Sequence, residues 1–537
     1  MAQWWKERII YQIYPRSFQD SNGDGIGDIP GIISRLDELA DLGVGAIWLS
    51  PVYPSPNADN GYDISDYRGI HPEYGTMADM EELIARAGER DIKIIMDLVI
   101  NHTSDRHIWF QRSRDKDSTY RDYYIWRKGR SEGGPPNNWT SFFAEKCWEF
   151  DELSGEYYLH LFAKSQPDLN WHNPQVMTEV ESILRFWLNK GVAGFRCDVI
   201  NVLYKNGLED GKKQLVLTGS EHYLSQPGTH EILGRLRARV LDQYDAFTVG
   251  ETAFITPKIA HDFIDPERRE LDQVFPFEHM ETDQFFVKWF RRPFRPKPFF
   301  EALAKWQQEL SWNAVYLENH DQPRSVSRFG DEGVYWEKSA KSLATLLLTL
   351  RGTPYIYQGQ EIGMTNFDFT SMDELDDVES RNVDAMAKGL HLPGWYRWRM
   401  MRSTSRDNAR TPYQWDGTEG GGFTTGRPWL GMNANRKDIN FAAQKDDPES
   451  VRSWYKTLIA FRKATPDLVE GEFKALKITD QIFVYRRGKG HLVAINLSGK
   501  PVRMGAKGTL ELSNYGRGKY NGVLLPYEAV ILRSERV

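Results

Sequence analysis

The stretch GFRCDVIN, residues 194–201, decides the fold: it is a short β-type run that carries two charged side chains, Arg196 and Asp198, at its end. Further β-type runs lie at residues 9–13, 46–49, 94–98, 247–250, 274–277, 314–317 and 355–357. Amphipathic stretches such as IISRLDELADLG and MEELIARAGERD separate most of them. Strands that alternate with helices in this way favour an α/β fold of the (β/α)8, or TIM barrel, type. A doubly wound parallel sheet has the same rhythm, so the number of runs alone leaves it open.

The spacing of these runs predicts the domain organisation. Residues 99–193 separate the third run from the fourth, and such a long connection indicates a functional lobe or a domain of its own. Near the C-terminus, short alternating runs such as QIFVYRR and HLVAIN are separated by Gly turns, which is typical of an antiparallel sheet. We therefore expect four parts: the first part of the barrel at 1–100, an inserted lobe at 101–172, the rest of the barrel at 173–465 with an excursion near 363–428, and a C-terminal antiparallel β domain at 466–537.

Composition excludes several classes of partner. The 537 residues carry a net charge of −7, which speaks against nucleic acid and anionic membranes as partners. No apolar run approaches the roughly 20 residues of a membrane helix, and the first residues do not form a secretory signal. The only two cysteines, Cys147 and Cys197, indicate a reducing compartment. We expect a cytoplasmic enzyme that is a monomer.

Charged and polar side chains gather where the predicted strands end. Barrel enzymes place their catalytic groups at these points. The ends of four runs, MDLVINH, GFRCDVIN, FTVGET and YLENHDQPR, supply Asp97, Asn101, His102, Arg196, Asp198, Glu251, His320 and Asp321. Any one acid there is more often a helix cap or a partner of arginine. Three acids on three separate strands, Asp198, Glu251 and Asp321, instead indicate a catalytic site at the barrel mouth, since Arg196 and two histidines lie beside them.

These motifs carry a family resemblance. DLVINH, GFRCDVIN, GETA and ENHDQPR match, in order and spacing, the four short motifs of the α-amylase superfamily (glycoside hydrolase family 13). The chain is similar over essentially its whole length to the oligo-1,6-glucosidase and dextran glucosidase branch. The resemblance implies a retaining, exo-acting α-glucosidase that releases α-glucose from the non-reducing ends of short α-1,6-linked glucans. It implies an oligosaccharide substrate and no organic cofactor.

The resemblance also implies roles for the residues at the mouth. Asp198 would be the nucleophile and Glu251 the acid/base, a pair that lies about 5 to 5.5 Å apart in retaining enzymes. Glu251 must keep its proton near neutral pH. Asp321 would hold the sugar 2- and 3-hydroxyls, and His102 and His320 would bind hydroxyls of the same glucose. Arg196 lies two residues before Asp198 on the same strand, so it points the same way and should keep Asp198 ionised.

Two further segments match the family and predict how the pocket closes. NGYDISDY supplies Tyr62 as a stacking platform and Asp63, and DNARTPYQW supplies Arg410. The resemblance implies that Asp63 and Arg410 pair behind the glucose 4- and 6-hydroxyls, although such a pair is usually only a salt bridge. Phe143 and Phe162 are candidates for the pocket lining, with core packing equally open. Cys197 should face away from Asp198 and pack outward.

The residue after the predicted nucleophile bears on linkage. Val199 stands where the family has Val in α-1,6-cleaving enzymes and often Ala or Thr in α-1,4-cleaving ones, so the resemblance implies α-1,6 cleavage. A β-branched side chain is stiff and blocks the approach of a directly 4-linked ring, whereas a 6-linked sugar has one more rotatable bond. Taken without the family, Val199 is simply a good strand residue.

A Gly-rich loop predicts a metal site. In SFQDSNGDGIGDIPG, oxygen ligands fall on alternate positions, with Gly at the sixth, as in the first half of an EF-hand loop. The predicted ligands are Asp20, Asn22, Asp24, the carbonyl of Ile26, and Asp28. Gly31 stands where an EF-hand has Glu, so the loop is no calcium sensor. The family resemblance favours a structural Ca²⁺ over a solvated turn, with Mg²⁺ as the alternative metal.

Other functions stay open at this point. A sucrose isomerase-type transglycosylase and an α-1,4-preferring α-glucosidase would share every catalytic residue. The motif GFRCDVIN is closer to the glucosidases, and the chain has no RLDRD-like motif typical of the isomerases. A non-catalytic partner like the transporter heavy chains of this fold would carry a membrane helix and lack part of the catalytic triad. The sequence favours the first reading, an α-1,6-glucosidase.

Overall fold

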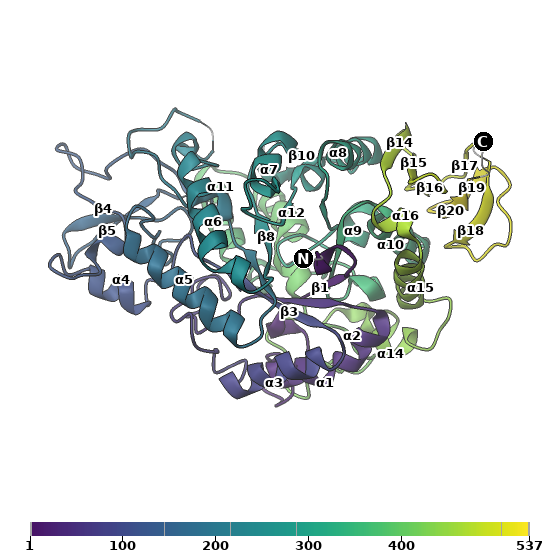
Figure 1. The fold of residues 1–537 in the computed structure, drawn as a ribbon, viewed down its shortest axis with the longest axis horizontal. Coiled ribbons are helices and arrows are strands. Elements are labelled where there is room, and N and C mark those ends of the chain that lie inside the picture. Colours follow the sequence, from purple (N-terminus) through teal and green to yellow (C-terminus); the bar gives the residue numbers. More distant parts are fainter. Residues whose placement is uncertain (1–2, 144, 215, 286, 506, 535–537) are drawn as a thin grey trace.

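The protein has three parts along its long axis, with the barrel between the other two (Figure 1). The computed structural model describes residues 3–143, 145–214, 216–285, 287–505 and 507–534. A lobe built from residues between the third and fourth barrel strands lies at one end, and a small antiparallel sheet at the C-terminal side lies at the other. Within the described residues, no helix has both the length and the apolar character needed to cross a membrane.

Eight parallel strands form the barrel, as the sequence predicts. Their order is β12-β13-β1-β2-β3-β7-β8-β9, and contacts between β9 and β12 nearly close the ring. The strands are β1 Ile10–Ile13, β2 Ala46–Leu49, β3 Lys93–Leu98, β7 Gly194–Cys197, β8 Phe247–Glu251, β9 Gln273–Phe275, β12 Ala314–Val315 and β13 Thr353–Tyr357. The doubly wound alternative is thereby excluded.

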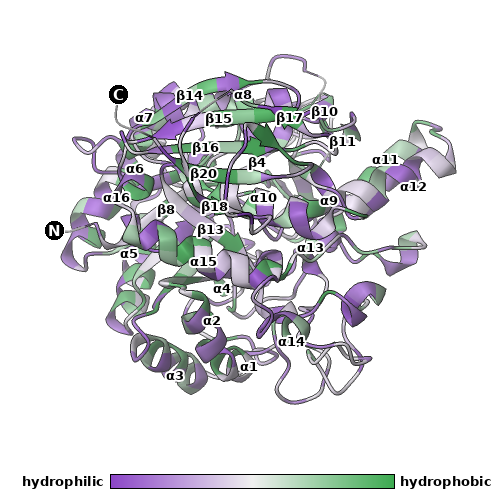
Figure 2. Ribbon diagram, turned by 90° about the vertical axis from the view of Figure 1, so that its right-hand side faces the viewer, coloured by the Kyte–Doolittle hydropathy of each residue, from purple (hydrophilic) through white to green (hydrophobic). Residues whose placement is uncertain are grey.

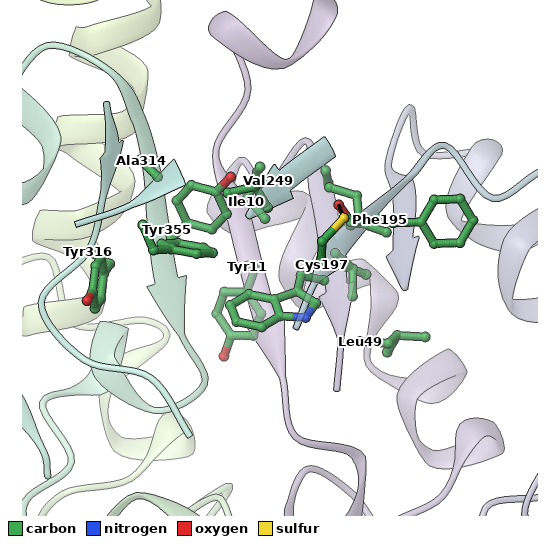
Figure 3. Packing of buried hydrophobic residues seen from close by; sticks show 14 of the residues in the cluster. Ile10, Tyr11, Leu49, Phe195, Cys197, Val249, Ala314, Tyr316 and Tyr355 are labelled. Carbon is green, nitrogen blue, oxygen red and sulfur yellow. Dashed lines mark hydrogen bonds between the residues drawn. The ribbon is translucent and has the colours of Figure 1, made fainter. Parts of the chain in front are cut away.

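The strands are short apolar runs because both of their faces are buried. Side chains from strands around the barrel belong to one apolar core, among them Ile10 of β1, Val249 of β8 and Tyr355 of β13 (Figure 3). Cys197 packs outward beside Leu184 and Leu236, which lie on the covering helices. These helices include α3 Met77–Gly88, α5 Pro174–Asn189, α6 Pro227–Arg239, α7 Pro257–Ile264, α8 Pro296–Glu309, α10 Trp336–Thr349 and α15 Val451–Ala464. The outward direction of Cys197 is as expected.

The inserted lobe contains a three-stranded antiparallel sheet in the order β4-β6-β5. Its elements are α4 Ile108–Ser113, β4 Trp126–Arg127, β5 Trp148–Asp151 and β6 Glu156–Leu159. A buried ion pair ties the lobe to the barrel: Lys205 Nζ lies 2.6 Å from Asp168 Oδ2 and 2.8 Å from Asn101 Oδ1. Because Lys205 follows the fourth barrel strand, this contact fixes the lobe over the mouth.

A helical pair stands out from the body beside the barrel (Figure 2). It consists of α11 Val378–Gly389 and α12 Gly394–Thr404, and it packs on the hairpin of β10 Gln284–Phe285 and β11 Val287–Arg291. An apolar cluster that includes Trp289, Val383 and Met401 holds these elements together. The pair belongs to the excursion that the sequence predicts after the eighth strand.

The C-terminal sheet has the strand order β14-β15-β16-β20-β18 and is antiparallel, as predicted. Its strands are β14 Phe473–Ile478, β15 Ile482–Arg487, β16 His491–Asn496, β18 Thr509–Ser513 and β20 Ala529–Arg533, next to the short pair β17 Val502–Arg503 and β19 Val523–Leu524. The rings of Phe483 in β15 and Phe300 in α8 are stacked 5.0 Å apart. Barrel and sheet therefore share one continuous apolar core.

Candidate active site

Arg196 is the centre of the candidate active site. Its Nη1 lies 2.5 Å from Asp97 Oδ1 and 2.8 Å from Asp198 Oδ1, and its Nη2 contacts Glu251 Oε2. Asp97 and Arg196 are register partners in the neighbouring parallel strands β3 and β7, so their side chains lie on the same side of the sheet. Glu251 ends the next strand, β8. One guanidinium thus joins the acidic ends of three adjacent strands.

The electrostatics of this cluster are dominated by burial. Burial raises the pKa of Asp97 to about 6, against the opposing charge of Arg196. Burial also raises the pKa of Asp198; Arg196 opposes this shift, while the like charges of Glu251 and Asp97 add to it. Asp198 therefore retains its proton more readily than an isolated aspartate does, because burial and the like charges beside it outweigh the attraction of Arg196.

A second group of side chains faces this cluster. Tyr62 stacks on His320 with ring centroids 5.3 Å apart, and its hydroxyl lies 2.7 Å from His320 Nε2. Gln12 Nε2 lies 2.8 Å from His320 Nδ1, so Nδ1 accepts and Nε2 carries the proton. Burial lowers the pKa of His320 to about 3, so the ring is neutral at physiological pH. His320 can therefore donate one hydrogen bond from Nε2.

Asp321 is held as a carboxylate. Its Oδ1 lies 2.7 Å from Arg410 Nη2 and 3.5 Å from Arg406 Nη1. Burial alone would raise the pKa of Asp321, but His320, Arg406 and Arg410 together hold it well below its usual range. A permanently charged carboxylate beside a sugar can accept hydrogen bonds from two vicinal hydroxyls.

The expected ion pair between Asp63 and Arg410 is wrong. Asp63 is fully buried, and its carboxylate accepts hydrogen bonds from the Ser55 hydroxyl and the amides of Ala58 and Asp59. Burial raises the pKa of Asp63 to about 6. The side chain shapes a loop, and Arg410 contacts Asp321 instead.

Sequence reasoning missed the ion pair that the structure does contain. Arg406 Nη2 lies 2.9 Å from Asp59 Oδ1 and 2.7 Å from Asp377 Oδ1. Asp59 and Asp63 are four residues apart, as are Arg406 and Arg410, but Asp59 and Arg406 each stand one residue before the motifs NGYDISDY and DNARTPYQW. Spacing alone cannot choose between the two Asp–Arg combinations. The helix α13 Asp407–Arg410 turns the two arginines toward different partners.

Acidic and basic side chains of the excursion extend this network. Glu379 of α11 contacts both Lys288 of β11 and Arg406, the latter at 3.7 Å. Glu379 is buried and Lys288 is half-buried. No motif in the sequence marked them, because they lie on a helix and a hairpin outside the barrel strands.

The aromatic candidates lie against the same group of side chains. The Phe162 ring lies 5.2 Å from His102, and the Arg406 guanidinium lies 5.6 Å from the Phe143 ring. His102 Nε2 lies 3.1 Å from the Tyr62 carbonyl oxygen, and burial lowers its pKa. These contacts bring His102, Phe143 and Phe162 together with Tyr62 and Arg406.

Val199 occupies an unusual conformation directly after Asp198. Its φ and ψ are 37° and 41°, in the left-handed region that β-branched residues rarely adopt. Its amide nitrogen lies 3.5 Å from Glu251 Oε2. Such strain persists only where the surroundings enforce it, which is common at functional sites. The side chain is half-buried and packs on the apolar core of the lobe.

The predicted metal loop is tightly folded. Asp20 accepts hydrogen bonds from the amides of Asn22, Gly23 and Gly25, and Asp28 caps α1 Ile29–Ser34 through the Gly31 amide. Gly25, at the sixth loop position, has a φ of 92°, the sharp turn that calcium loops need there. A carboxylate oxygen has two lone pairs, so one that accepts a backbone hydrogen bond can still accept a further partner. Over the described part of the chain, no group of three or more His, Cys, Asp or Glu has metal-binding geometry.

Fold and site together define a barrel glycosidase: residues 12–471 match the Alpha amylase, catalytic domain, family, and the chain belongs to that family. It is 52% identical to the oligo-1,6-glucosidase of Parageobacillus thermoglucosidasius over 90% of this chain and 87% of that protein. It is 49% identical to the oligo-1,6-glucosidase of Halalkalibacterium halodurans, over 98% of both chains. Among solved structures, isomaltulose synthase from Klebsiella sp. LX3 superposes with a TM-score of 0.96 at 40% identity, over 99% of both chains.

Proposed function

We propose that this protein is a retaining exo-α-glucosidase that releases α-glucose from the non-reducing ends of short α-1,6-linked glucans. The observation that carries the proposal is the contact of one guanidinium, that of Arg196, with both Asp198 and Glu251. Two carboxyl groups at the mouth of a barrel are the equipment of a retaining glycosidase. The identity to two oligo-1,6-glucosidases supports the α-1,6 linkage.

Each carboxyl group has a separate task in this mechanism. Glu251 donates its proton to the glycosidic oxygen while the bond from that oxygen to C1 breaks and an oxygen of Asp198 forms a bond to C1. Glu251, now a carboxylate, then takes a proton from water. The water oxygen bonds to C1, the bond to Asp198 breaks, and α-glucose leaves. Arg196 stabilises the carboxylate form of Asp198 before attack and after release.

The remaining side chains would hold the terminal glucose. Asp321, which is permanently ionised, would accept hydrogen bonds from the 2- and 3-hydroxyls. His320 would donate one from Nε2 once a sugar hydroxyl replaces the Tyr62 hydroxyl as its acceptor. Tyr62 would pack against the ring. The ion pair of Asp59 and Arg406, instead of the expected pair of Asp63 and Arg410, would close the pocket behind the 4-hydroxyl. A closed pocket admits only chain ends, which makes the action exo.

A hydrolysis panel tests the function. We expect isomaltose and isomaltotriose to be cleaved much faster than maltose, trehalose or sucrose. The first glucose released should be the α anomer, as followed by NMR. Sucrose needs its own assay because isomaltulose synthase superposes closely on this chain. Chromatography that shows isomaltulose or trehalulose as the main products from sucrose would favour the transglycosylase, and β-glucose as the first product would exclude retention.

Variants of the two carboxyl groups test the mechanism. Asp198→Asn should keep its fold and lose glycosidase activity by several orders of magnitude, because no covalent intermediate can form. Glu251→Gln should retain more activity on nitrophenyl glucoside than on isomaltose, because a good leaving group needs little protonation. Equal losses on the two substrates would contradict the assignment of Glu251 as the acid.

We further propose that the loop at residues 20–28 binds a structural Ca²⁺ or Mg²⁺ through Asp20, Asn22, Asp24, the Ile26 carbonyl and Asp28. A cation bound only by the native state stabilises that state by mass action. Chelation should therefore lower the melting temperature but leave the activity of the folded enzyme unchanged. Loss of activity at an unchanged melting temperature would place the metal elsewhere.

Compartment and assembly complete the proposal. Cys147 and Cys197 are both buried and unpaired by disulfide, and burial raises the pKa of each thiol, which keeps both in the unreactive protonated form. This supports a cytoplasmic enzyme. We also keep the monomer as a proposal, which sedimentation or light scattering would test.

A further inference from the structure

A second groove lies beside the excursion, apart from the candidate active site. Its volume is about 900 Å³, which is within the range of small-molecule sites. It runs between α12, the segment at 365–368 that follows β13, and the segment at 433–439. Of the residues that line it, none belongs to the candidate catalytic cluster around Arg196. The groove therefore has no part in the chemistry described above.

Aromatic rings form the apolar part of the groove. Trp336, Phe367 and Trp398 line it, and all three are half-buried. The Trp336 indole is fixed in place because its Nε1 donates to the Gly363 carbonyl at 2.8 Å. Phe367 and Trp398 pack on the apolar cluster beneath α12. Rings that are held in this way keep exposed surface on which the C–H groups of a sugar can pack.

Polar groups surround these rings. Asn435 Nδ2 donates to Thr365 Oγ1 at 2.7 Å, so the amide is oriented before any ligand arrives. Exposed charges of both signs line the same groove, namely Glu332, Asp368, Asp438, Arg399 and Arg402. Carboxylates accept hydrogen bonds from hydroxyls, and amides and guanidinium groups donate to them. Three negative and two positive charges do not suit a polyanion, whereas they suit a neutral ligand rich in hydroxyls.

The groove shares its supporting elements with the glucose pocket. The Asn366 side-chain oxygen accepts the backbone amide of Arg324 at 2.9 Å, three residues after Asp321. Arg402 lies on α12, which ends just before Arg406 of the Asp59 ion pair. We propose that this groove is a non-catalytic binding site for an α-glucan segment of several glucose units. The choice of an α-glucan as the ligand rests on the function proposed above, whereas the groove itself is argued from its lining.

Ser403 offers a way to fill the groove without changing the core. It lies on α12, is exposed and lines the groove, and its hydroxyl donates to the Arg399 carbonyl. Ser403→Trp should therefore block the groove, and Ser403→Ala is the matched control. Both changes are made in the Asp198→Asn protein, with 1-deoxynojirimycin occupying the glucose pocket. Isomaltoheptaose binding is then measured by calorimetry, and melting temperatures verify the fold.

We expect Ser403→Ala to bind isomaltoheptaose with unchanged affinity and Ser403→Trp to bind at least tenfold more weakly. Ser403→Trp in the otherwise unchanged enzyme should raise KM for long glucans only, with isomaltose kinetics preserved. Equal binding by the two variants, or no binding outside the glucose pocket, overturns the proposal. If isomaltose is not hydrolysed but the Ser403 variants still differ in binding, the groove stands and the proposed enzymatic function falls.

Discussion

Val199 combines backbone strain with a position next to Asp198 and Glu251, the two carboxyl groups that we propose to be catalytic. A β-branched residue in the left-handed region costs on the order of 1 to 3 kcal/mol, a cost that evolution rarely retains without a use. The side chain is half-buried, and the Val199 amide nitrogen lies 3.5 Å from Glu251 Oε2. A stiff side chain there is suited to reject a leaving sugar that is linked too closely.

We predict that Val199→Ala raises maltose hydrolysis relative to isomaltose by about 10- to 200-fold, the range that one or two methyl contacts can supply. The measurement is the ratio of kcat/KM for the two disaccharides. Ile200→Val is the matched control, because Ile200 is the adjacent residue, is fully buried and should leave the ratio unchanged. An unchanged ratio in Val199→Ala would remove the steric account of linkage and leave the glucosidase assignment intact.

The pKa of Asp198 predicts a pH dependence. The proposed nucleophile attacks only as a carboxylate, so the rate should fall as pH decreases through the pKa of Asp198. Burial raises the pKa of Asp198; Arg196 opposes the shift, and the neighbouring charges of Glu251 and Asp97 add to it. We therefore expect the acidic limb of kcat/KM to have its midpoint above the ordinary aspartate value of 3.8.

Asp97→Asn provides the control for this pH profile. The substitution removes one negative charge from the cluster, so the acidic limb should move to lower pH. A limb that moves upward, or one that lies at the ordinary aspartate value in the unaltered enzyme, would show that another group controls the rate.

For single residues, the sequence predicts which strand ends carry charge. Parallel barrel strands all end at the same mouth, so the positions of Asp97, Arg196, Asp198 and Glu251 at the ends of their runs place all four there. It does not predict partners between loops. The choice between Asp59 and Asp63, and between Arg406 and Arg410, depends on how two irregular segments turn. Lys288 and Glu379 carried no sequence signal because they lie on β11 and α11, outside the barrel strands.

Among the elements, the inserted lobe depends on one buried cation. Lys205 is 3% exposed and Asp168 is fully buried. If either residue of this ion pair is removed, water cannot reach the remaining charge to solvate it. Burial lowers the pKa of Lys205, while Asp168 acts to keep it charged. The lobe supplies Phe143 and Phe162 to the pocket, so its position matters for substrate binding.

We predict that Lys205→Ala lowers the free energy of unfolding by about 3 to 5 kcal/mol, the usual cost of leaving a buried charge unpaired. The lobe should open first, so limited proteolysis should cut within residues 101–172 before the rest of the chain. Lys213→Ala, an exposed lysine in the same connection, is the control and should behave as the unaltered protein. A normal melting temperature and cleavage pattern for Lys205→Ala would show that the lobe is held by its apolar contacts alone.

The elements themselves were predictable to different degrees. The eight barrel strands could be predicted because each is a buried apolar run bounded by polar residues. The strands of the lobe are two to four residues long, and β4 and β5 contain exposed positions, so no apolar run marks them. The helices α11 and α12 stand beside the barrel. Sequence periodicity can predict a helix, but it does not predict against which part of the molecule that helix packs.

The molecule as a whole shares one apolar core between the barrel and the C-terminal sheet. The cluster that contains Ile10 and Val249 of the barrel also contains Phe483 and Ile531 of the sheet. Arg487 of β15 is fully buried and donates to the Thr349 carbonyl at the end of α10. Parts joined by a common core unfold together. The domain bounds drawn from the sequence remain predictions.

We predict that Phe483→Ala, which leaves a cavity between β15 and α8, costs about 3 to 5 kcal/mol and lowers the melting temperature of the whole molecule. Calorimetry should show one transition, and loss of activity should follow it. Leu476→Ala is the control, because Leu476 of β14 is 49% exposed. A separate early transition in Phe483→Ala, with activity retained above it, would show that the sheet unfolds on its own.

The distance between the lobe and the C-terminal sheet along the long axis has a practical consequence for attaching the enzyme to a surface (Figure 1). Both native thiols are buried, so a maleimide reagent would find little to react with on the folded protein. A cysteine introduced at the exposed Lys519, between β18 and β19, would be a single anchoring point at the end of the molecule opposite the lobe. Enzyme tethered there to beads or an electrode would present its barrel mouth to the flowing solution, with every copy in the same orientation.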